Sequence, residues 1–297
     1  MILQNKLGKS DITVSALALG CMSLQSDDTN ADMQCIRHAY DNGVTHFDTA
    51  DLYGFGANEI LLGAAVSSFR NNITLATKVG NEWNDSKSSW RWNVKKDYIL
   101  KAVESSLSRL KTDYIDLYQI HGGTIDDNFD EVIETMEILV QQGKIRAYGI
   151  SSIRPNVFTY YASNTNIASN MMQYSMLDTR PNKYLPMLKK DNVAVISRGG
   201  LAQGLLVGKP SKSYLTHSHA TVTQLQHRIK ELALKLEIPI EAIPLAYSLQ
   251  NPLITSTLIG PRNMEQLRSL INIYDIAMKI DVSSIDIPFL DYTDHLV

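Results

Sequence analysis

The sequence predicts an α/β protein, a (β/α)8 TIM barrel with a short N-terminal β-hairpin. Eight short apolar segments typical of buried strands alternate with segments of helical periodicity along the 297 residues. Mostly apolar strands indicate a parallel sheet that is covered by helices. No glycine-rich phosphate loop, the usual mark of an open doubly wound sheet, is present, so eight units of this length favour the barrel.

The predicted strands are short runs rich in aliphatic residues. They cover residues 16–20, 44–50, 72–80, 113–121, 145–151, 168–175, 193–198 and 254–260. The preceding residues 1–15 resemble a hairpin. Because no shift in composition marks a boundary, we expect one domain that spans residues 1–297.

The predicted helices lie between these strands and carry apolar residues at helical spacing. They cover residues 29–43, 57–66, 97–110, 128–143, 153–164, 181–192, 222–237, 240–250 and 264–273. The clearest is 128–143, in which apolar residues from Phe129 to Val140 recur every three or four positions. Gly143 is a typical stop signal for this helix.

The composition excludes several classes of function. The net charge is −3 and no basic run is present, so nothing favours binding to nucleic acid or to an anionic membrane. Two cysteines, Cys21 and Cys35, are too few for a disulfide framework, which favours a reducing compartment. No apolar run reaches the ~20 residues of a membrane span, and the N-terminus lacks the core of a signal peptide. We therefore expect a cytoplasmic monomer or small homo-oligomer.

A metal site is not expected. His217 and His219 are the nearest approach to a metal motif, but they lie in a Ser/Thr/His-rich loop and a structural zinc site needs four ligands.

Polar residues stand at the C-terminal ends of the predicted strands, where barrel enzymes keep their active sites. Asp48 and Tyr53 follow the second strand, Lys78 ends the third and His121 ends the fourth. The later strands end at Ser151 and Ser152, Gln173, Arg198, and Gly260 with Arg262. Each alone has an ordinary explanation, since Lys78 could be solvated, His121 could lie at the barrel rim and Asp48 could cap a turn. Their combination on three successive strands favours an active site.

This set of side chains has a coherent chemistry. A tyrosine is a weak acid with an ordinary pKa of about 10, and a nearby ammonium stabilises its phenolate. A carboxylate can hold the lysine in place, and a histidine can bind a substrate oxygen. Such a site could give a proton to a carbonyl group, while a cofactor supplies the hydride. Asp51 is expected to shape the turn before Tyr53 or to face solvent.

Six segments resemble the successive signatures of the aldo-keto reductase superfamily. They are residues 47–63, 74–80, 113–122, 143–152, 201–209 and 259–267, in family order. The resemblance runs from about residue 7 to residue 271. It implies a TIM barrel and the NADPH-dependent reduction of an aldehyde or ketone to an alcohol.

The family's catalytic tetrad falls on Asp48, Tyr53, Lys78 and His121. The resemblance implies that Tyr53 is the proton donor in reduction and that Lys78 lowers its pKa. It further implies that Asp48 pairs with Lys78 and that His121 orients the carbonyl group.

The resemblance also implies contacts with the cofactor. The nicotinamide side involves Ser151 and Gln173, with Tyr174 as an aromatic ring that could stack on the nicotinamide. Arg262 and Gln266 fall on positions that hold the adenosine phosphate and adenine, and the cation favours NADPH over NADH. The implied cofactor residues are Gly20, Cys21, Met22, Asp48, Ser151, Ser152, Gln173, Tyr174, Arg198, Gly199, Gly200, Leu201, Gly260, Arg262 and Gln266.

The sequence departs from the family pattern at three cofactor positions. Ser152 replaces an asparagine, and a hydroxyl cannot reproduce a two-ended carboxamide contact. Residues 198–201, Arg-Gly-Gly-Leu, replace Tyr-Ser-Pro-Leu, so the usual stacking ring is absent there. Ser269 and Leu270 replace a Glu-Asn pair, which removes hydrogen bonds to adenine.

The substrate side contains all three tryptophans, between Trp83 and Trp92. This loop follows Lys78, so it could form an aromatic wall or simply pack on the barrel rim. We expect Tyr53, Trp83, Trp90 and His121 to line a fairly open pocket for a small carbonyl compound.

Two alternative functions remain open. One is an NADP(H)-binding regulatory subunit, as in relatives that resemble potassium-channel β-subunits. The other is an aldolase that forms a Schiff base on Lys78. The second needs a desolvated, uncharged lysine, whereas Asp48 would keep Lys78 charged.

Overall fold

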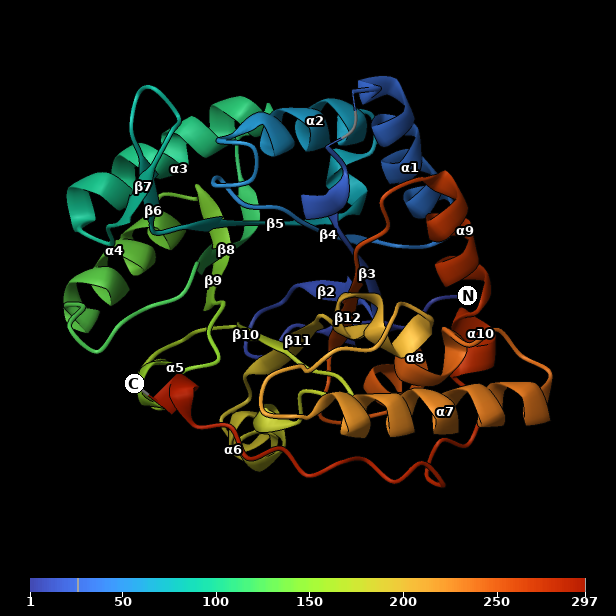
Figure 1. The fold of residues 1–297 in the computed structure, drawn as a ribbon. Coiled ribbons are helices and arrows are strands. Elements are labelled where there is room, and N and C mark those ends of the chain that lie inside the picture. Colours follow the sequence, from blue (N-terminus) through green and yellow to red (C-terminus); the bar gives the residue numbers. More distant parts are fainter. Residues whose placement is uncertain (26, 297) are drawn as a thin grey trace.

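The computed structural model describes residues 1–25 and 27–296, and its centre is a closed barrel of eight strands (Figure 1). All the adjacent strands in the barrel pair in parallel, in the order β10, β11, β12, β3, β4, β5, β8 and β9. The strands are β3 (Leu17–Gly20), β4 (His46–Asp48), β5 (Thr74–Val79), β8 (Ile115–Ile120), β9 (Ile145–Ile150), β10 (Ser169–Gln173), β11 (Ala194–Arg198) and β12 (Ser256–Ile259). Each lies inside one predicted strand, which confirms the predicted barrel.

Helices surround the barrel on its outer side (Figure 1). They are α1 (Thr29–Asp41), α2 (Ala57–Val66), α3 (Lys96–Leu110), α4 (Phe129–Gln141), α5 (Pro155–Asn164), α6 (Leu185–Lys190), α7 (His219–Leu236), α8 (Ala242–Leu249), α9 (Met264–Asn272) and α10 (Tyr274–Ala277). The described residues also form short 3-10 helices, which are η1 (Cys21–Ser23), η2 (Arg70–Asn72), η3 (Arg180–Lys183), η4 (Ala202–Val207) and η5 (Asp294–Leu296). α7 begins earlier than predicted because the Ser218 hydroxyl caps it, accepting a 3.1 Å hydrogen bond from the Thr221 N–H.

The N-terminal hairpin consists of β1 (Gln4–Lys6) and β2 (Thr13–Ser15), as predicted. Its apolar side chains, including Leu7 and Val14, pack with small residues inside the barrel such as Ala76 and Ala194. Gly8 turns the hairpin with φ +54°, and a Cβ there would lie 2.2 Å from the Ala168 carbonyl oxygen. Only glycine fits this approach. The hairpin therefore covers the end of the barrel opposite to the strand C-termini.

The tryptophan segment forms a second hairpin, which the sequence did not predict. β6 (Asn81–Trp83) pairs antiparallel with β7 (Trp90–Trp92), and Trp83 lies opposite Trp90. This hairpin projects from the C-terminal end of β5. It therefore stands beside the residues that the sequence singles out as catalytic.

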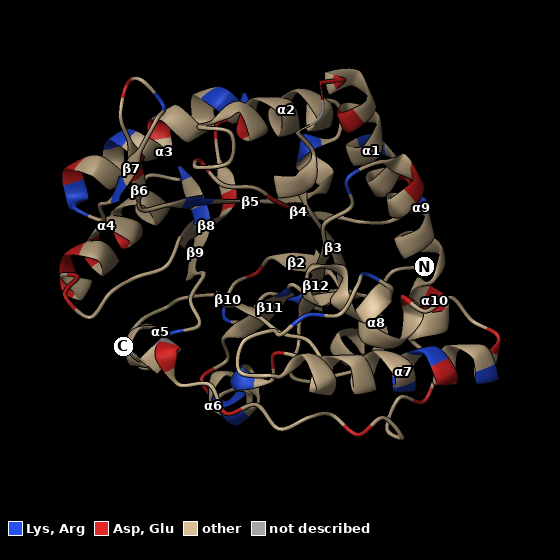
Figure 2. Ribbon diagram, viewed as in Figure 1, with Lys and Arg blue, Asp and Glu red and all other residues tan. Residues whose placement is uncertain are grey.

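Charged residues of both signs are distributed over the outer helices, including α3, α4 and α7, while the barrel strands are mostly uncharged (Figure 2). Within residues 1–25 and 27–296, no helix is both long and apolar enough to cross a lipid bilayer.

Candidate active site

Three neighbouring strands, β4, β5 and β8, bring the predicted catalytic residues together. In the barrel, β5 pairs with β4 on one side and with β8 on the other, and Lys78 of β5 lies opposite Gln119 of β8. Asp48 is the last residue of β4, and His121 directly follows β8. The C-terminal ends of parallel strands meet at one end of a barrel, so these side chains share one site.

Lys78 is the centre of this site and is 1% exposed. Its ammonium donates hydrogen bonds to Asp48 Oδ1 at 2.6 Å and to the Thr49 carbonyl oxygen at 2.7 Å. It also lies 3.5 Å from the Tyr53 hydroxyl oxygen. Burial alone would lower the pKa of Lys78, but the adjacent Asp48 carboxylate raises it above its ordinary value. Lys78 is therefore a fixed ammonium ion beside the tyrosine hydroxyl.

Asp48 is held on its other oxygen by a residue that the sequence analysis missed. Gln119 Nε2 donates to Asp48 Oδ2 at 3.3 Å, and both side chains are buried. The available signal was a glutamine near the C-terminal end of a predicted strand, two residues before His121. Each carboxylate oxygen of Asp48 thus accepts a hydrogen bond, which holds the carboxylate in one orientation towards Lys78.

Tyr53 lies on the loop between β4 and α2, and the backbone of this loop needs unusual conformations. Gly54, Phe55 and Gly56 all have positive φ, of 57°, 49° and 88°. A Cβ on Gly56 would lie 2.6 Å from the Arg109 side chain, so Arg109 of α3 packs directly on the loop. Arg109 in turn donates to the buried Glu59 at 2.6 Å. This ion pair fixes the loop that carries Tyr53.

Asp51 lies in the same loop and is 1% exposed, so it does not face solvent. Neither of its carboxyl oxygens has a hydrogen-bond partner among the described residues. Burial and the nearby Glu59 carboxylate raise the pKa of Asp51 well above its ordinary value. Its backbone N–H, 3.4 Å from the Lys78 carbonyl oxygen, ties the loop to β5.

His121 faces Tyr53 across the site. The two ring centroids are 5.8 Å apart and the rings are nearly perpendicular, at 83°. Burial and the cations Lys78 and Arg198 lower the pKa of His121 to about 3. The imidazole is therefore neutral at physiological pH, and it can donate or accept one hydrogen bond without changing its charge.

The residues that were predicted to bind the nicotinamide and the neighbouring phosphates lie on the other side of the barrel end, where β9, β10 and β11 end. Gln173 ends β10 opposite Arg198, which ends β11. Gly199 follows with φ 73°, and a Cβ there would approach only the Gln173 side chain, at 3.8 Å. Ser151 is half-buried after β9. The space beside Gly199 is therefore open apart from the Gln173 side chain.

Several other residues that were predicted to bind the cofactor are buried or make contacts within the protein instead. Ser152 is buried, and its hydroxyl accepts a hydrogen bond from the Arg154 N–H at 3.2 Å. Cys21 is fully buried, whereas its neighbour Met22 is 55% exposed. The buried ring of Tyr174 stacks on Tyr247 with centroids 5.1 Å apart. The geometry therefore gives no support to Tyr174 as a ring that stacks on nicotinamide.

The residues that were predicted to bind the adenosine part of the cofactor lie at the start of α9. Asn263 caps this helix by accepting from the Gln266 N–H at 3.0 Å, and the Gln266 carbonyl Oε1 accepts from the Arg262 N–H at 3.0 Å. The guanidinium of Arg262 is exposed, with no ion-pair partner among the residues that the structure describes. It is therefore available to an anion. Gly200 and Leu201 are half-buried, and Gly260 is exposed.

The tryptophans occupy three different environments. Trp90 is 54% exposed, and Trp83 packs edge-on against Phe55 with centroids 6.1 Å apart. Trp92, which the sequence analysis did not select, packs against two glycines beside the candidate site. A Cβ on Gly80 would lie 2.5 Å from the Trp92 ring and one on Gly122 would lie 3.6 Å from it, and these glycines follow Lys78 by two residues and His121 by one. The Trp92 indole N–H donates to Asp127 at 2.7 Å, which fixes the ring.

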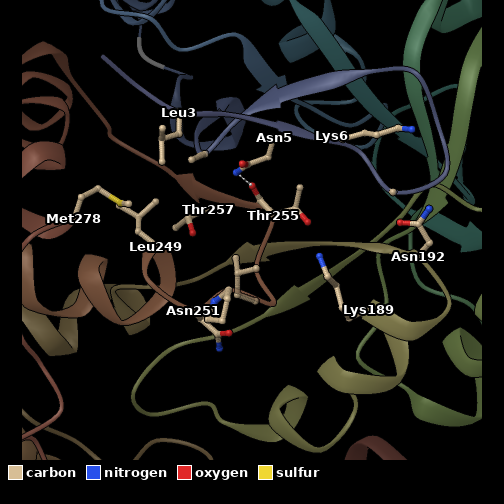
Figure 3. Close-up of a pocket in the computed structure, with 14 residues that line it drawn as sticks. Leu3, Asn5, Lys6, Lys189, Asn192, Leu249, Asn251, Thr255, Thr257 and Met278 are labelled. Atoms are coloured by element: carbon tan, nitrogen blue, oxygen red, sulfur yellow. Dashed lines mark hydrogen bonds between the residues drawn. The ribbon is translucent and has the colours of Figure 1, made fainter.

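A different pocket, of about 360 Å³, lies at the opposite end of the barrel (Figure 3). It is bounded by the N-terminal hairpin and by the starts of the last strands, with Lys6, Lys189, Asn251 and Thr255 among its lining residues. None of the predicted site residues lines it. The described residues also include no cluster of three or more His, Cys, Asp or Glu side chains that could hold a metal ion.

We compared the chain with families of known proteins and with solved structures. The model of the aldo/keto reductase family matches residues 16–286. An uncharacterized oxidoreductase of Bacillus subtilis, YqkF, is 45% identical over 274 residues, which are 89% of this chain and 89% of that protein. The holo form of the aldo-keto reductase AKR11C1 from Bacillus halodurans superposes with a TM-score of 0.86 at 40% identity, covering 95% of this chain and 92% of that one.

One similar protein is named for NADH rather than NADPH. An NADH-specific methylglyoxal reductase of Escherichia coli is 27% identical over 312 residues, covering 94% of this chain and 94% of that protein. Membership of the family therefore indicates an oxidoreductase without fixing its choice between the two nicotinamide cofactors.

Proposed function

The chain belongs to the aldo/keto reductase family, and from this premise we propose that it reduces an aldehyde or ketone to the alcohol with a nicotinamide cofactor. The single observation that carries the proposal is the buried contact of Lys78 with Asp48 and Tyr53, with His121 facing the same tyrosine. The arrangement aims one proton donor, Tyr53, and one neutral hydrogen-bonding group, His121, at a common space.

The residues at the other side of the barrel end fit a nicotinamide dinucleotide. Gln173 offers an amide to the nicotinamide carboxamide, and Arg198 and Arg262 are exposed cations suited to phosphate oxygens. The positive φ of Gly199 lets the backbone approach a ligand closely. When bound, the reduced nicotinamide supplies the hydride that no amino-acid side chain can supply.

In this proposal Tyr53 gives its hydroxyl proton to the carbonyl oxygen as negative charge develops there. The Lys78 ammonium, 3.5 Å from that hydroxyl, stabilises the resulting phenolate. Asp48 and the Thr49 carbonyl hold the ammonium in position. His121, with its pKa near 3, is neutral and orients the carbonyl oxygen through its ring.

We further propose that NADPH is preferred to NADH, because the Arg262 guanidinium is available to a 2′-phosphate. We also propose that the substrate is a small carbonyl compound bordered by Trp83, Trp90 and Trp92. Trp92 joins this group because its ring lies against Gly80 and Gly122, next to Lys78 and His121.

The geometry disfavours the aldolase alternative. A Schiff base needs a neutral amine, whereas the Lys78 ammonium bonds to Asp48 and its pKa is raised. Borohydride trapping of a carbonyl compound on Lys78 without any cofactor would instead support that chemistry.

The test is a panel of aldehydes and ketones at a fixed concentration of NADPH, repeated with NADH, with loss of the reduced nicotinamide absorbance as the readout. We expect turnover that depends on both the carbonyl compound and the cofactor, and that is faster with NADPH. Cofactor binding without turnover of any compound would contradict the reductase and favour a regulatory subunit.

A further inference from the structure

A buried arginine stands behind Gln173 and is not part of the proposed catalytic set. Arg180 begins the turn η3, and its side chain is 6% exposed. It grips Asp178, which is 1% exposed, at two points: Nε donates to Oδ1 at 2.7 Å and Nη2 donates to Oδ2 at 2.6 Å. A two-point contact between two planar groups leaves the guanidinium little freedom.

Asp178 is itself fixed by the backbone around it. Its N–H donates to the Ser175 carbonyl oxygen at 3.0 Å, and its own carbonyl oxygen accepts from the Ser175 N–H at 3.1 Å. This tight turn follows β10 directly, two residues after Gln173. On the other side, the Tyr292 ring of the C-terminal segment covers Arg180, whose guanidinium carbon lies 4.8 Å from the ring centroid. Arg180 is therefore a rigid part of the wall behind Gln173.

Arg180 also makes a third contact, and this contact determines which atom of the Gln173 amide, the oxygen or the nitrogen, faces Arg180. Arg180 Nη2 donates to Gln173 Oε1 at 3.1 Å. A guanidinium has only donors, so the glutamine atom that faces it must be the oxygen. The Gln173 amide nitrogen consequently points away from Arg180, and it donates no hydrogen bond to the described residues.

We propose that Arg180 is a positioning residue that presents the Gln173 NH2 group, as a donor, to the carbonyl oxygen of the nicotinamide carboxamide. This inference rests on the proposed function, because it assumes that Gln173 binds the nicotinamide. Without Arg180 the amide could turn over and offer its oxygen to the carboxamide NH2 group instead. Arg180 thus selects which end of the carboxamide this site recognises.

Two cofactor analogues distinguish the two orientations of the amide. The thionicotinamide analogue of NADP⁺ carries sulfur, a weak acceptor, in place of the carboxamide oxygen. The 3-acetylpyridine analogue keeps the oxygen but has a methyl group in place of NH2. A Gln173 that donates should discriminate against the first analogue, and a Gln173 that accepts should discriminate against the second.

The variant to compare with the wild-type protein is the double substitution Asp178→Asn/Arg180→Met. It removes both charges, because Arg180→Met alone would leave a buried carboxylate without its cation. The matched control is Glu59→Gln/Arg109→Met, which removes a different ion pair of an arginine with a buried carboxylate, the one beside the loop that carries Tyr53, and leaves Gln173 untouched. Dissociation constants of NADP⁺ and of both analogues are measured by calorimetry for all three proteins.

We expect the wild-type protein and the control to bind the thionicotinamide analogue about fivefold more weakly than NADP⁺, the effect of one neutral hydrogen bond. In Asp178→Asn/Arg180→Met this ratio should fall towards one, while the ratio for the 3-acetylpyridine analogue should rise. Equal ratios in the wild-type protein and the double variant would overturn the inference. So would wild-type protein that binds the thionicotinamide analogue as tightly as NADP⁺, a result that needs no variant.

The outcomes that would overturn the proposed function differ from those that would overturn only the role of Arg180. Wild-type protein that binds neither NADP⁺ nor NAD⁺ would overturn both proposals. Wild-type protein that binds NADP⁺ and reduces carbonyl compounds, yet does not distinguish the analogues, would overturn only the role of Arg180.

Discussion

The charged groups that the two sides of the barrel end present to a ligand differ in burial and in pairing. On the tetrad side, Lys78 is 1% exposed and its ammonium is bound by Asp48 and by the Thr49 carbonyl. On the cofactor side, Arg198 and Arg262 are exposed, and neither has an ion-pair partner within the described part of the chain. Both groups stand at or just beyond the C-terminal ends of barrel strands.

The difference follows from the cost of burying a charge. A cation inside the protein must be paired during folding, because an unpaired buried charge is strongly destabilising. An exposed cation is solvated by water and can acquire its partner later, from a ligand. The tetrad side is therefore fixed when the protein folds, whereas the proposed cofactor side would acquire its charged partners only when a ligand binds. Substitutions on the first side should change stability and rate, whereas those on the second should change mainly affinity.

The largest effect should come from Tyr53→Phe, which removes the proposed proton donor and keeps the ring. We expect kcat to fall by about 10²–10⁴-fold, the usual contribution of a general acid, with cofactor affinity retained. Steady-state kinetics and cofactor titration measure the two quantities. Tyr160→Phe, which removes a hydroxyl bonded to Asp130 on the outer layer, is the control and should keep the wild-type rate. An unchanged rate in Tyr53→Phe would mean that another group gives the proton.

Lys78→Met should affect both rate and stability. It leaves Asp48 buried without its cation, which costs about 3–5 kcal/mol of unfolding free energy. The double variant Asp48→Asn/Lys78→Met removes both charges and should recover most of that stability but none of the lost rate. Urea unfolding and turnover are measured on the same preparations. Rate and stability that recover together would show that the pair has only a structural role.

Arg262→Gln tests the cofactor side. Loss of one charge-assisted contact with a 2′-phosphate should raise the KM for NADPH by roughly 10- to 100-fold. The KM for NADH, which lacks that phosphate, and the melting temperature without cofactor should stay close to the wild-type values. Equal changes for NADPH and NADH would contradict the assignment of Arg262 to the 2′-phosphate.

The pH dependence of stability tests the burial of the tetrad side. Folded His121, with its pKa lowered to about 3, stays neutral where an unfolded histidine, with a pKa of about 6.5, binds a proton. Between these values the unfolded chain binds more protons, so the stability from neutral His121 is present above pH 6.5 and is lost as the pH falls towards 3. In His121→Gln the slope of unfolding free energy against pH should be shallower by up to about 1.4 kcal/mol per pH unit. His227, whose side chain is 72% exposed, supplies the control, and an unchanged slope in His121→Gln would contradict a half-buried imidazole that stays neutral in the folded protein.

The smallest effect is expected at the far end of the barrel. Lys189 lines the pocket beside the N-terminal hairpin and is exposed. Lys189→Ala should change kcat, KM and stability by no more than about twofold or ~0.5 kcal/mol, as surface substitutions usually do. A large loss of activity in this variant would mean that the two ends of the barrel are coupled.

Much of this site could be predicted from the sequence because its residues end predicted strands. Asp48, Lys78, His121 and Gln173 all lie within one residue of the end of a barrel strand, so once the barrel is recognised their proximity follows. Trp92 and Arg180 could not be found in this way. Trp92 is placed by a hairpin that the sequence did not predict and by its bond to Asp127, and Arg180 is placed by a turn that brings it back onto Gln173.

The sequence by itself determined the pattern of the barrel strands and of most helices, and it placed Asp48, Lys78 and His121 at strand ends, because periodicity and strand ends are local properties of the chain. The tertiary structure alone decided which groups are buried and which partners they meet. It showed Asp51 buried rather than facing solvent, and it showed Tyr174 stacked on Tyr247 in the core. It also showed the oxygen of Gln173 turned towards Arg180. Burial and hydrogen-bond direction depend on side chains from distant segments, which a linear pattern does not bring together.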